Sequence, residues 1–140
     1  MNELIPLMRE AVNKGLKKDF EAFEHDDAHI QNELLFLNDV LNFLQKKWTM
    51  DLIYIIRIKE KPLFFNDIRR ALPNLNSRTL STRLKEFEGN HVVTRTVSDT
   101  QPIRVSYELT DLGNGVYELL LPLLFFFAAE KHKLDKKEPS

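Results

Sequence analysis

The chain has 140 residues, of which 43% are hydrophobic, and it contains no cysteine. This length and apolar content suit one folded unit with a hydrophobic core. Without thiols, the chain can hold no disulfide framework, thiolate zinc site, iron–sulfur cluster or cysteine nucleophile.

The net charge of −1 is unevenly distributed along the chain. Residues 46–104 hold 12 Lys and Arg against 6 Asp and Glu, whereas the remaining residues hold 8 Lys and Arg against 15 Asp and Glu. A basic centre between acidic flanks suggests a polyanionic partner, although a solvated surface gives the same pattern.

The amino-terminal residues mix charge into every turn and lack the apolar stretch and cleavage site of a secretory signal. The longest apolar run, residues 119–129, spans 11 residues and includes Pro122. A bilayer needs roughly 20 apolar residues. We therefore expect a cytoplasmic protein without a membrane partner, in which this run is a buried helix.

Three helices are predicted before residue 60. The first covers about residues 3–24, where apolar side chains recur at steps of three and four and form one stripe. This stripe consists of Ile5, Met8, Val12, Leu16, Phe20 and Phe23. The second covers about residues 32–46, and the third covers about residues 48–59 and ends before Pro62. The side chains expected to be buried in the third helix are Trp48, Leu52, Ile55 and Ile56.

Two short helices joined by a tight turn follow. The first ends at Pro73, residues 74–76 form the turn, and Asn76 can cap the second helix, residues 77–88. Leu80, Leu84 and Phe87 lie at i, i+4 and i+7 of this helix, so they predict one narrow buried face. At 100° per residue, the opposite face carries side chains that suit base edges and phosphates. They are Arg78, Ser81, Thr82 and Lys85.

Two strands with a period of two are predicted at residues 92–97 and 103–109, joined by a polar tip of residues 98–102. Thr110 would cap a final helix that reaches about Lys131, and the charged residues after Glu130 are expected to form a solvated tail. Two helices, a turn between them and a hairpin behind them are the plan of a helix-turn-helix with a wing. The predicted fold class is mainly α with a small β-hairpin (α+β): a winged helix-turn-helix with extra N- and C-terminal dimerisation helices.

Several motifs in order resemble the HxlR-type winged-helix regulators of bacteria and archaea. They are Lys47-Trp48, FNDIRRALPNLNSRTLSTRLKEFEGNHVVTRTV and PIRVSYELTDLG, and the likeness covers about residues 46–124. The resemblance implies a homodimeric DNA-binding transcriptional regulator with recognition helix 77–88, wing 98–102 and terminal helices at the dimer interface. Many members carry a cysteine shortly before the Lys-Trp element, but residues 38–45 hold none. Cysteine-based sensing is therefore excluded for this chain.

This interpretation divides a single structural unit into three parts. Residues 1–45 would form N-terminal helices for dimerisation or support. Residues 46–110 would form the DNA-binding winged helix-turn-helix, and residues 111–140 would form the C-terminal dimerisation helix and the charged tail. The dimer interface is expected at Ile5, Met8, Val12, Val116, Leu119, Leu120, Leu123 and Phe127. Late in the final helix, residues 125–127 are phenylalanines where the family often has a tryptophan, which bears on this interface.

The expected DNA partner is a double-stranded, near-palindromic operator, with helix 77–88 in the major groove and the wing near the backbone or the minor groove. In and before the recognition helix, the candidate contacts are Arg69, Arg70, Ser77, Arg78, Thr79, Ser81, Thr82 and Lys85. In and beside the wing they are Arg95, Thr100, Gln101 and Arg104. For Arg83 and Arg104, a structural salt bridge and a phosphate contact both stay open.

Three alternatives were weighed. His25 and His29 are four residues apart, as in helical zinc sites, but the spacing is a weak pattern and the segment is expected at the end of the first helix. Histidines are common at the carboxyl end of a helix for dipole reasons, so we expect no metal and no cofactor. The fold could instead serve as a protein-interaction module without DNA binding. The chain has no Gly-rich phosphate loop or nucleophile elbow, so we expect no enzyme. A small-molecule effector of unknown identity stays open.

Overall fold

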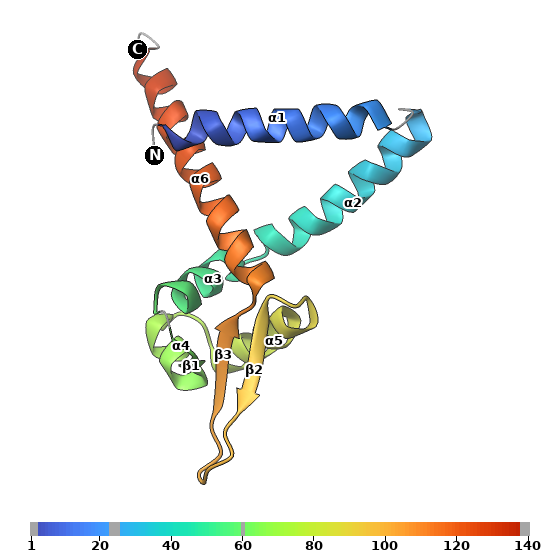
Figure 1. Ribbon diagram of the computed structural model, residues 1–140. Helices are drawn as coiled ribbons and strands as arrows, with labels where there is room; N and C mark the ends of the chain where they lie inside the picture. Colours follow the sequence, from blue (N-terminus) through green and yellow to red (C-terminus); the bar gives the residue numbers. More distant parts are fainter. Residues whose placement is uncertain (1–2, 23–25, 60, 138–140) are drawn as a thin grey trace. The chain divides into compact units, whose positions relative to one another are not determined.

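The computed structural model describes residues 3–22, 26–59 and 61–137. The described elements (Figure 1) are α1 (Leu4–Ala22), α2 (Asp27–Gln45), α3 (Thr49–Ile58), β1 (Leu63–Phe64), α4 (Phe65–Ala71), α5 (Ser77–Gly89), β2 (Val93–Val97), β3 (Val105–Leu109) and α6 (Asp111–Lys137). The chain divides into a central unit, residues 44–121, and a terminal unit, residues 1–43 with 122–140. The predicted α+β winged helix-turn-helix is confirmed in the central unit.

The sheet of the central unit is antiparallel with the order β1-β3-β2. In the hairpin, β2 and β3 pair in an uninterrupted register from Val93 opposite Leu109 to Val97 opposite Val105. β1 adds two residues on the other side of β3, with Leu63 opposite Tyr107. The core beneath the sheet and helices consists of Leu52, Ile53, Ile56, Leu63, Ile68, Leu75, Leu80, Leu84, Phe87, Val92, Val93, Tyr107 and Leu109.

The two helices of the helix-turn-helix begin at side-chain caps. The Asn76 side chain accepts a hydrogen bond from the backbone N–H of Thr79 at 2.8 Å, which confirms the predicted cap of α5. In α4, the Asp67 carboxylate accepts a hydrogen bond from the backbone N–H of Phe64 at 3.0 Å. Each bond satisfies a donor that a helix start leaves without an intrahelical partner, so both helices begin at defined residues.

The final helix begins where it touches β2. The Thr110 side chain accepts a hydrogen bond from the Gly113 N–H at 3.1 Å, as the predicted cap requires, and its hydroxyl lies 2.5 Å from the His91 carbonyl oxygen. A Cβ at Gly113 would lie 2.3 Å from the Val92 carbonyl oxygen, which is closer than real Cβ contacts. Only glycine therefore allows α6 to pass this close to the start of β2.

The structure corrects two predictions: which side chains of α3 are buried, and where α2 begins. In α3, Thr49 and Ile53 are buried, whereas Trp48 and Ile55 are only half-buried. The reason is that Trp48 lies before the helix with φ of 77°, so the helical face starts at Thr49. α2 begins at Asp27, because Asp26 accepts a hydrogen bond from the His29 N–H at 2.7 Å and caps it.

The final helix also differs from expectation. It continues to Lys137, through most of the predicted tail, since residues 123–137 contain no Pro or Gly and its last turn carries Lys136 and Lys137, which favour a helix C-terminus. Residues 119–129 are not buried within the chain. By length and composition α6 could also cross a membrane, and 6% of its most apolar window is buried inside the protein. A single helix of this kind is weak evidence for a membrane span, because helices that pack in soluble proteins pass the same test.

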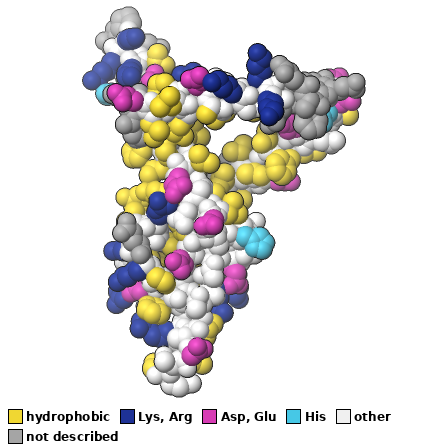
Figure 2. Space-filling model, in the orientation of Figure 1, with side chains coloured by type: hydrophobic (Ala, Val, Ile, Leu, Met, Phe, Trp, Pro, Cys, Tyr) yellow, Lys and Arg dark blue, Asp and Glu magenta, His cyan; other side chains and the backbone are white. Residues whose placement is uncertain are grey.

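Among its described residues, the terminal unit leaves much of its apolar surface uncovered. Its side chains contact across α1 and α6, where the Arg9 guanidinium lies 5.9 Å from the centroid of the Phe126 ring. α2 buries none of its residues. Hydrophobic side chains line α2 and the region where α1 meets α6 in Figure 2.

The close approach at Gly113 can be tested by adding one methyl group. We expect Gly113→Ala to lower the free energy of unfolding by about 1 to 3 kcal/mol, because the new Cβ must displace a backbone carbonyl. Gly115→Ala is the control, since a Cβ at Gly115 meets nothing within 4 Å. It should stabilise the same helix by roughly 0.5 to 1 kcal/mol. Urea denaturation measures both, and equal effects of the two substitutions would contradict the packing at Gly113.

Candidate nucleic-acid interface

The burial of one face of α5 determines which side chains it presents to solvent. Leu80, Leu84 and Phe87 are exposed by no more than 1%, as predicted, and hold that face in the core. On the other side, Arg78, Thr82 and Lys85 are exposed, and Ser77, Thr79 and Ser81 are half-buried. The Thr82 hydroxyl donates a hydrogen bond to the Arg78 carbonyl oxygen at 3.0 Å. The exposed face thus offers a guanidinium, an ammonium and hydroxyl groups.

A basic groove adjoins the start of α5. It is lined by Asn66, Arg69, Arg70, Pro73, Leu75, Asn76 and Ser77. Lys and Arg side chains gather on the flank of the central unit where α4 and β1 lie (Figure 2). Arg69 and Arg70 are both exposed there, one helix before the turn. Side chains on this helix can reach a DNA backbone when α5 lies in a groove.

Asp67 holds one of these arginines. Its carboxylate lies 2.6 Å from Arg70 Nη2. The hydrogen bond from the Phe64 N–H, followed by the one from Arg70, lowers the pKa of Asp67 below its usual 3.8. Arg70 is therefore partly neutralised, whereas Arg69 has no ion pair among the described residues.

The cations of the wing lie at its base and not at its tip. Thr100 and Gln101 are exposed at the tip, but residues 96–103 contain no Lys or Arg and carry Asp99. Arg95 is exposed on β2. The Arg104 guanidinium lies 3.6 Å from the centroid of the Phe64 ring, and its backbone N–H donates to Ser98 Oγ at 2.8 Å. Stacking on Phe64 restrains Arg104, so its charge has a defined place beside α4.

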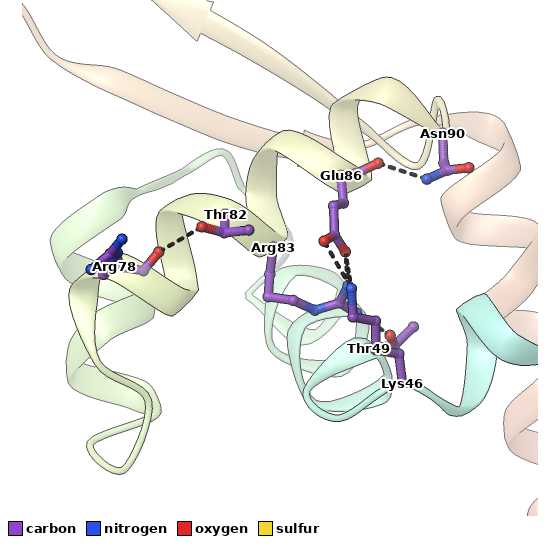
Figure 3. Close-up of polar contacts among 7 residues, drawn as sticks. All are labelled: Lys46, Thr49, Arg78, Thr82, Arg83, Glu86 and Asn90. Carbon is purple, nitrogen blue, oxygen red and sulfur yellow. Dashed lines mark hydrogen bonds and ion pairs between the residues drawn. The ribbon is translucent and has the colours of Figure 1, made fainter.

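Arg83 lies on α5 but faces inward, in a cluster that sequence reasoning left unassigned. This Arg83 cluster consists of Lys46, Thr49, Arg83 and Glu86 (Figure 3). The Arg83 guanidinium is buried and donates to Glu86 and to the hydroxyl of Thr49. Lys46 Nζ donates to both Glu86 oxygens, at 2.8 and 3.1 Å. These contacts resolve the role of Arg83 as a structural ion pair.

Glu86 stays ionised within this cluster. The hydrogen bond from Lys46 is the largest cause that lowers the pKa of Glu86 below its usual 4.5, and the charge of Arg83 acts in the same direction. A carboxylate between two cations is stabilised in its charged form. The sequence signal for this contact is weak: Arg83 and Glu86 are three apart on one helix, but Thr49 is 34 residues away.

The predicted dimer residues are spread over α1 and α6. Val12, Leu119, Leu123 and Phe127 are exposed by 57 to 66%. Ile5, Met8, Val116 and Leu120 are half-buried. A further exposed apolar set lies on α2, within residues 1–45, which were predicted as helices for dimerisation or support. The exposed members of this set are Ile30, Leu34, Leu35, Phe36, Leu37, Val40 and Leu41.

The histidine pair yields no metal site within the described residues. His25 lies outside them, and the backbone N–H of His29 takes part in the cap of α2. No group of three or more His, Cys, Asp or Glu side chains there could hold a metal ion. The interpretation of this position as the carboxyl end of a helix is wrong for His29, because His29 lies in the first turn of α2, at the amino-terminal end of that helix.

An α4–turn–α5 pair followed by a paired hairpin defines a winged helix-turn-helix protein. Residues 43–133 match the HxlR-like helix-turn-helix family, so the chain belongs to this family and is a DNA-binding transcriptional regulator. It is 38% identical over 80 residues to the uncharacterized HTH-type transcriptional regulator YvaP of Bacillus subtilis (strain 168), covering 57% of this chain and 72% of that protein. It is 30% identical over 126 residues to YdeP of the same organism, covering 90% and 91%.

Solved structures show the same fold. The reduced form of the transcriptional regulator YodB from B. subtilis has a TM-score of 0.58 and 27% identity, over 64% of this chain and 85% of that one. A regulator of the MarR family from Enterococcus faecalis V583 has a TM-score of 0.67 over 81% and 96%, and at 24% identity it supports the fold alone.

The Asp67 contacts predict a pH-dependent contribution to stability. Because the pKa of Asp67 is lower in the folded protein, its carboxylate stabilises the fold above pH 3.8, and this contribution is lost as the pH falls through the folded-state pKa. We expect Asp67→Ala to cost about 1 kcal/mol at pH 7 and progressively less in acid. Thermal unfolding against pH measures the difference. Asp99→Ala, at the exposed hairpin tip, is the control; a cost of Asp67→Ala that stays constant down to pH 2 would contradict the assignment.

Proposed function

We propose that the protein binds a near-palindromic DNA duplex as a homodimer, with α5 as the recognition helix in the major groove. The observation that carries this proposal is the division of α5 into a buried apolar face and an exposed face with Arg78, Thr82 and Lys85. Arg can bind guanine O6 and N7 as a fork, and Lys supplies a point charge to a phosphate. Ser77, Thr79 and Ser81, half-buried at the start of the helix, would bind nearby phosphates or base edges.

The remaining candidates would position the protein on the duplex. Arg69, which has no ion pair among the described residues, and Arg104, which is held against the Phe64 ring, would present their charges to phosphates beside the recognition helix. Arg70 would do so while still paired with Asp67. Thr100 and Gln101 would carry the hairpin tip near the backbone or the minor groove. With no cation at the tip, Arg95 and Arg104 at its base would make the wing's electrostatic contacts.

The second copy of the chain would cover the apolar helices of the terminal unit. Leu119, Leu123 and Phe127 are exposed on one helix, and large contiguous apolar patches on soluble proteins mark interaction sites. A two-fold dimer would set two recognition helices about one DNA turn apart, near 34 Å, which is why the operator should be a near-palindrome. Residues 1–45 and 111–140 would then serve dimerisation, residues 46–110 would bind DNA, and the protein would act in the cytoplasm.

Redox sensing by thiols does not extend to this chain. YodB is described in reduced and diamide-treated forms, and HypR is described as a redox regulator. The 140 residues here contain no cysteine, so any effector would have to act through other groups. The alternative of a protein-interaction module is disfavoured because the exposed face of α5 is polar and cationic.

Two substitutions on α5 separate base contacts from phosphate contacts. We expect Arg78→Ala to weaken operator binding by roughly 1 to 3 kcal/mol and to relax preference at one base pair. Lys85→Ala should instead weaken binding to all duplexes alike and lower the slope of affinity against salt by about one ion. Fluorescence anisotropy on the operator and on a scrambled duplex, over a salt series, measures both. Wild-type affinity of the Arg78→Ala variant would show that another face binds DNA.

The dimer is tested by placing a charge in the proposed interface. Leu123→Asp should raise the dimer dissociation constant at least about tenfold, because a buried unpaired carboxylate costs more than 1.4 kcal/mol. Leu112→Asp is the matched control, since Leu112 is also exposed on α6 but lies outside the proposed interface. Light scattering at micromolar concentration reports the mass. A wild-type protein that is monomeric there would refute the homodimer.

A further inference from the structure

We propose that the Arg83 cluster positions the recognition helix, so that residues which touch no DNA determine how well the protein distinguishes its operator from other sequences. The inference rests on the proposed function and extends it to residues on the far side of α5. Its basis is a buried cation on α5, Arg83, which donates to Thr49 at the junction between α2 and α3 and to Glu86, whose carboxylate also accepts from Lys46 of that junction (Figure 3).

Because the Arg83 guanidinium is buried, losing any of its contacts would be energetically costly. Arg83 is 3% exposed, and its hydroxyl partner Thr49 is not exposed at all. A buried guanidinium is tolerated only if it is neutralised and hydrogen-bonded. Its Nε already has no hydrogen-bond partner among the described residues. Because any rotation or sliding of α5 that broke the bond from Arg83 to Thr49 would leave more of the buried charge unsatisfied, α5 has one favoured position.

Lys46 ties the same site to a second point on the chain. It follows directly after α2, and its ammonium bridges both oxygens of Glu86. The backbone N–H of Thr49 donates to the Lys46 carbonyl oxygen at 3.1 Å, so the two anchor residues are held together in one tight turn. Glu86 therefore accepts hydrogen bonds from Arg83 on its own helix and from Lys46 at the α2–α3 junction.

The cluster lies where it controls the orientation of α5. At 100° per residue, Arg83 and Glu86 are on the flank between the buried face and the face that carries Arg78 and Lys85. In Figure 3, Arg83 and Glu86 make the contacts drawn to Thr49 and Lys46 of the junction, whereas Arg78 and Thr82 contact only each other. Base recognition tolerates displacements of only about 0.5 Å and 10 to 20°. Flexible side chains can still reach phosphates after a larger shift, so loosening this flank should reduce discrimination more than general DNA affinity.

Lys46→Met tests the proposal, with Lys47→Met as its control. Each variant loses one positive charge at adjacent positions, but Lys47 lies 5.3 Å from the Trp48 ring centroid and outside the cluster. The probes are a duplex of about 30 base pairs, three turns of DNA, that the wild-type protein selects from a randomised pool, and a scrambled duplex of the same composition. We expect Lys46→Met to lower the ratio of the two affinities about three- to fivefold, and Lys47→Met to leave that ratio unchanged.

Two further variants separate positioning from mere stability. Lys46→Arg keeps the contact with Glu86 and should restore the affinity ratio. Arg83→Met keeps an unbranched buried side chain, shorter than that of arginine and without its charge, and should lower the ratio more than Lys46→Met does. A purely structural role would shift the melting temperature of these variants but not the affinity ratio.

The outcomes are distinguishable. Equal ratios for Lys46→Met and Lys47→Met, with a wild-type protein that prefers its selected duplex, would overturn the role of the Arg83 cluster alone. A wild-type protein that selects no duplex would overturn the proposed function and this inference together. A lower ratio for Lys46→Met that Lys46→Arg restores would support both.

Discussion

The burial of Leu80, Leu84 and Phe87 is the contact on which the rest of the structure depends. These side chains fill the centre of the core from α5, and their removal from water is the main source of stability for the helix-turn-helix. The same burial decides the opposite face, because helical geometry leaves Arg78 and Lys85 no position other than the surface. Core packing and the exposed cationic face proposed to bind DNA are thus two consequences of one helix orientation.

The buried charge refines that orientation. Apolar packing is non-directional, so it fixes the buried face of α5 more firmly than its exact rotation. Hydrogen bonds from Arg83 and Lys46 are directional, and both converge on Glu86. Burying the Arg83 guanidinium costs desolvation free energy, but the directional bonds that compensate for this cost favour one orientation of α5.

The sequence predicted helices and strands correctly where apolar residues recur at a regular spacing over a long segment. The cap at Asn76, the α5 face and the paired hairpin could be read from local spacing alone. The two residues of β1 show no period, so their pairing with β3 was invisible. The inward position of Arg83 was equally hidden, because an arginine among polar residues fits either side of a narrow apolar stripe and its partner Thr49 is distant in the chain.

In the terminal unit, the sequence predicted which helical positions are apolar, but it did not show that these side chains stay exposed within a single chain. A buried helix was expected at residues 119–129, yet Leu119 and Phe127 are each 66% exposed, and α2 has no buried residue. Burying such surface is favourable at about 25 cal/mol per Å² of apolar area, so a partner that covers these helices gains substantial free energy. The proposed second copy would satisfy this need with surfaces the chain already has, whereas the polar exposed face of α5 gains nothing from apolar contact. The two surfaces would then serve different partners, and a substitution in one should leave the chemistry of the other intact.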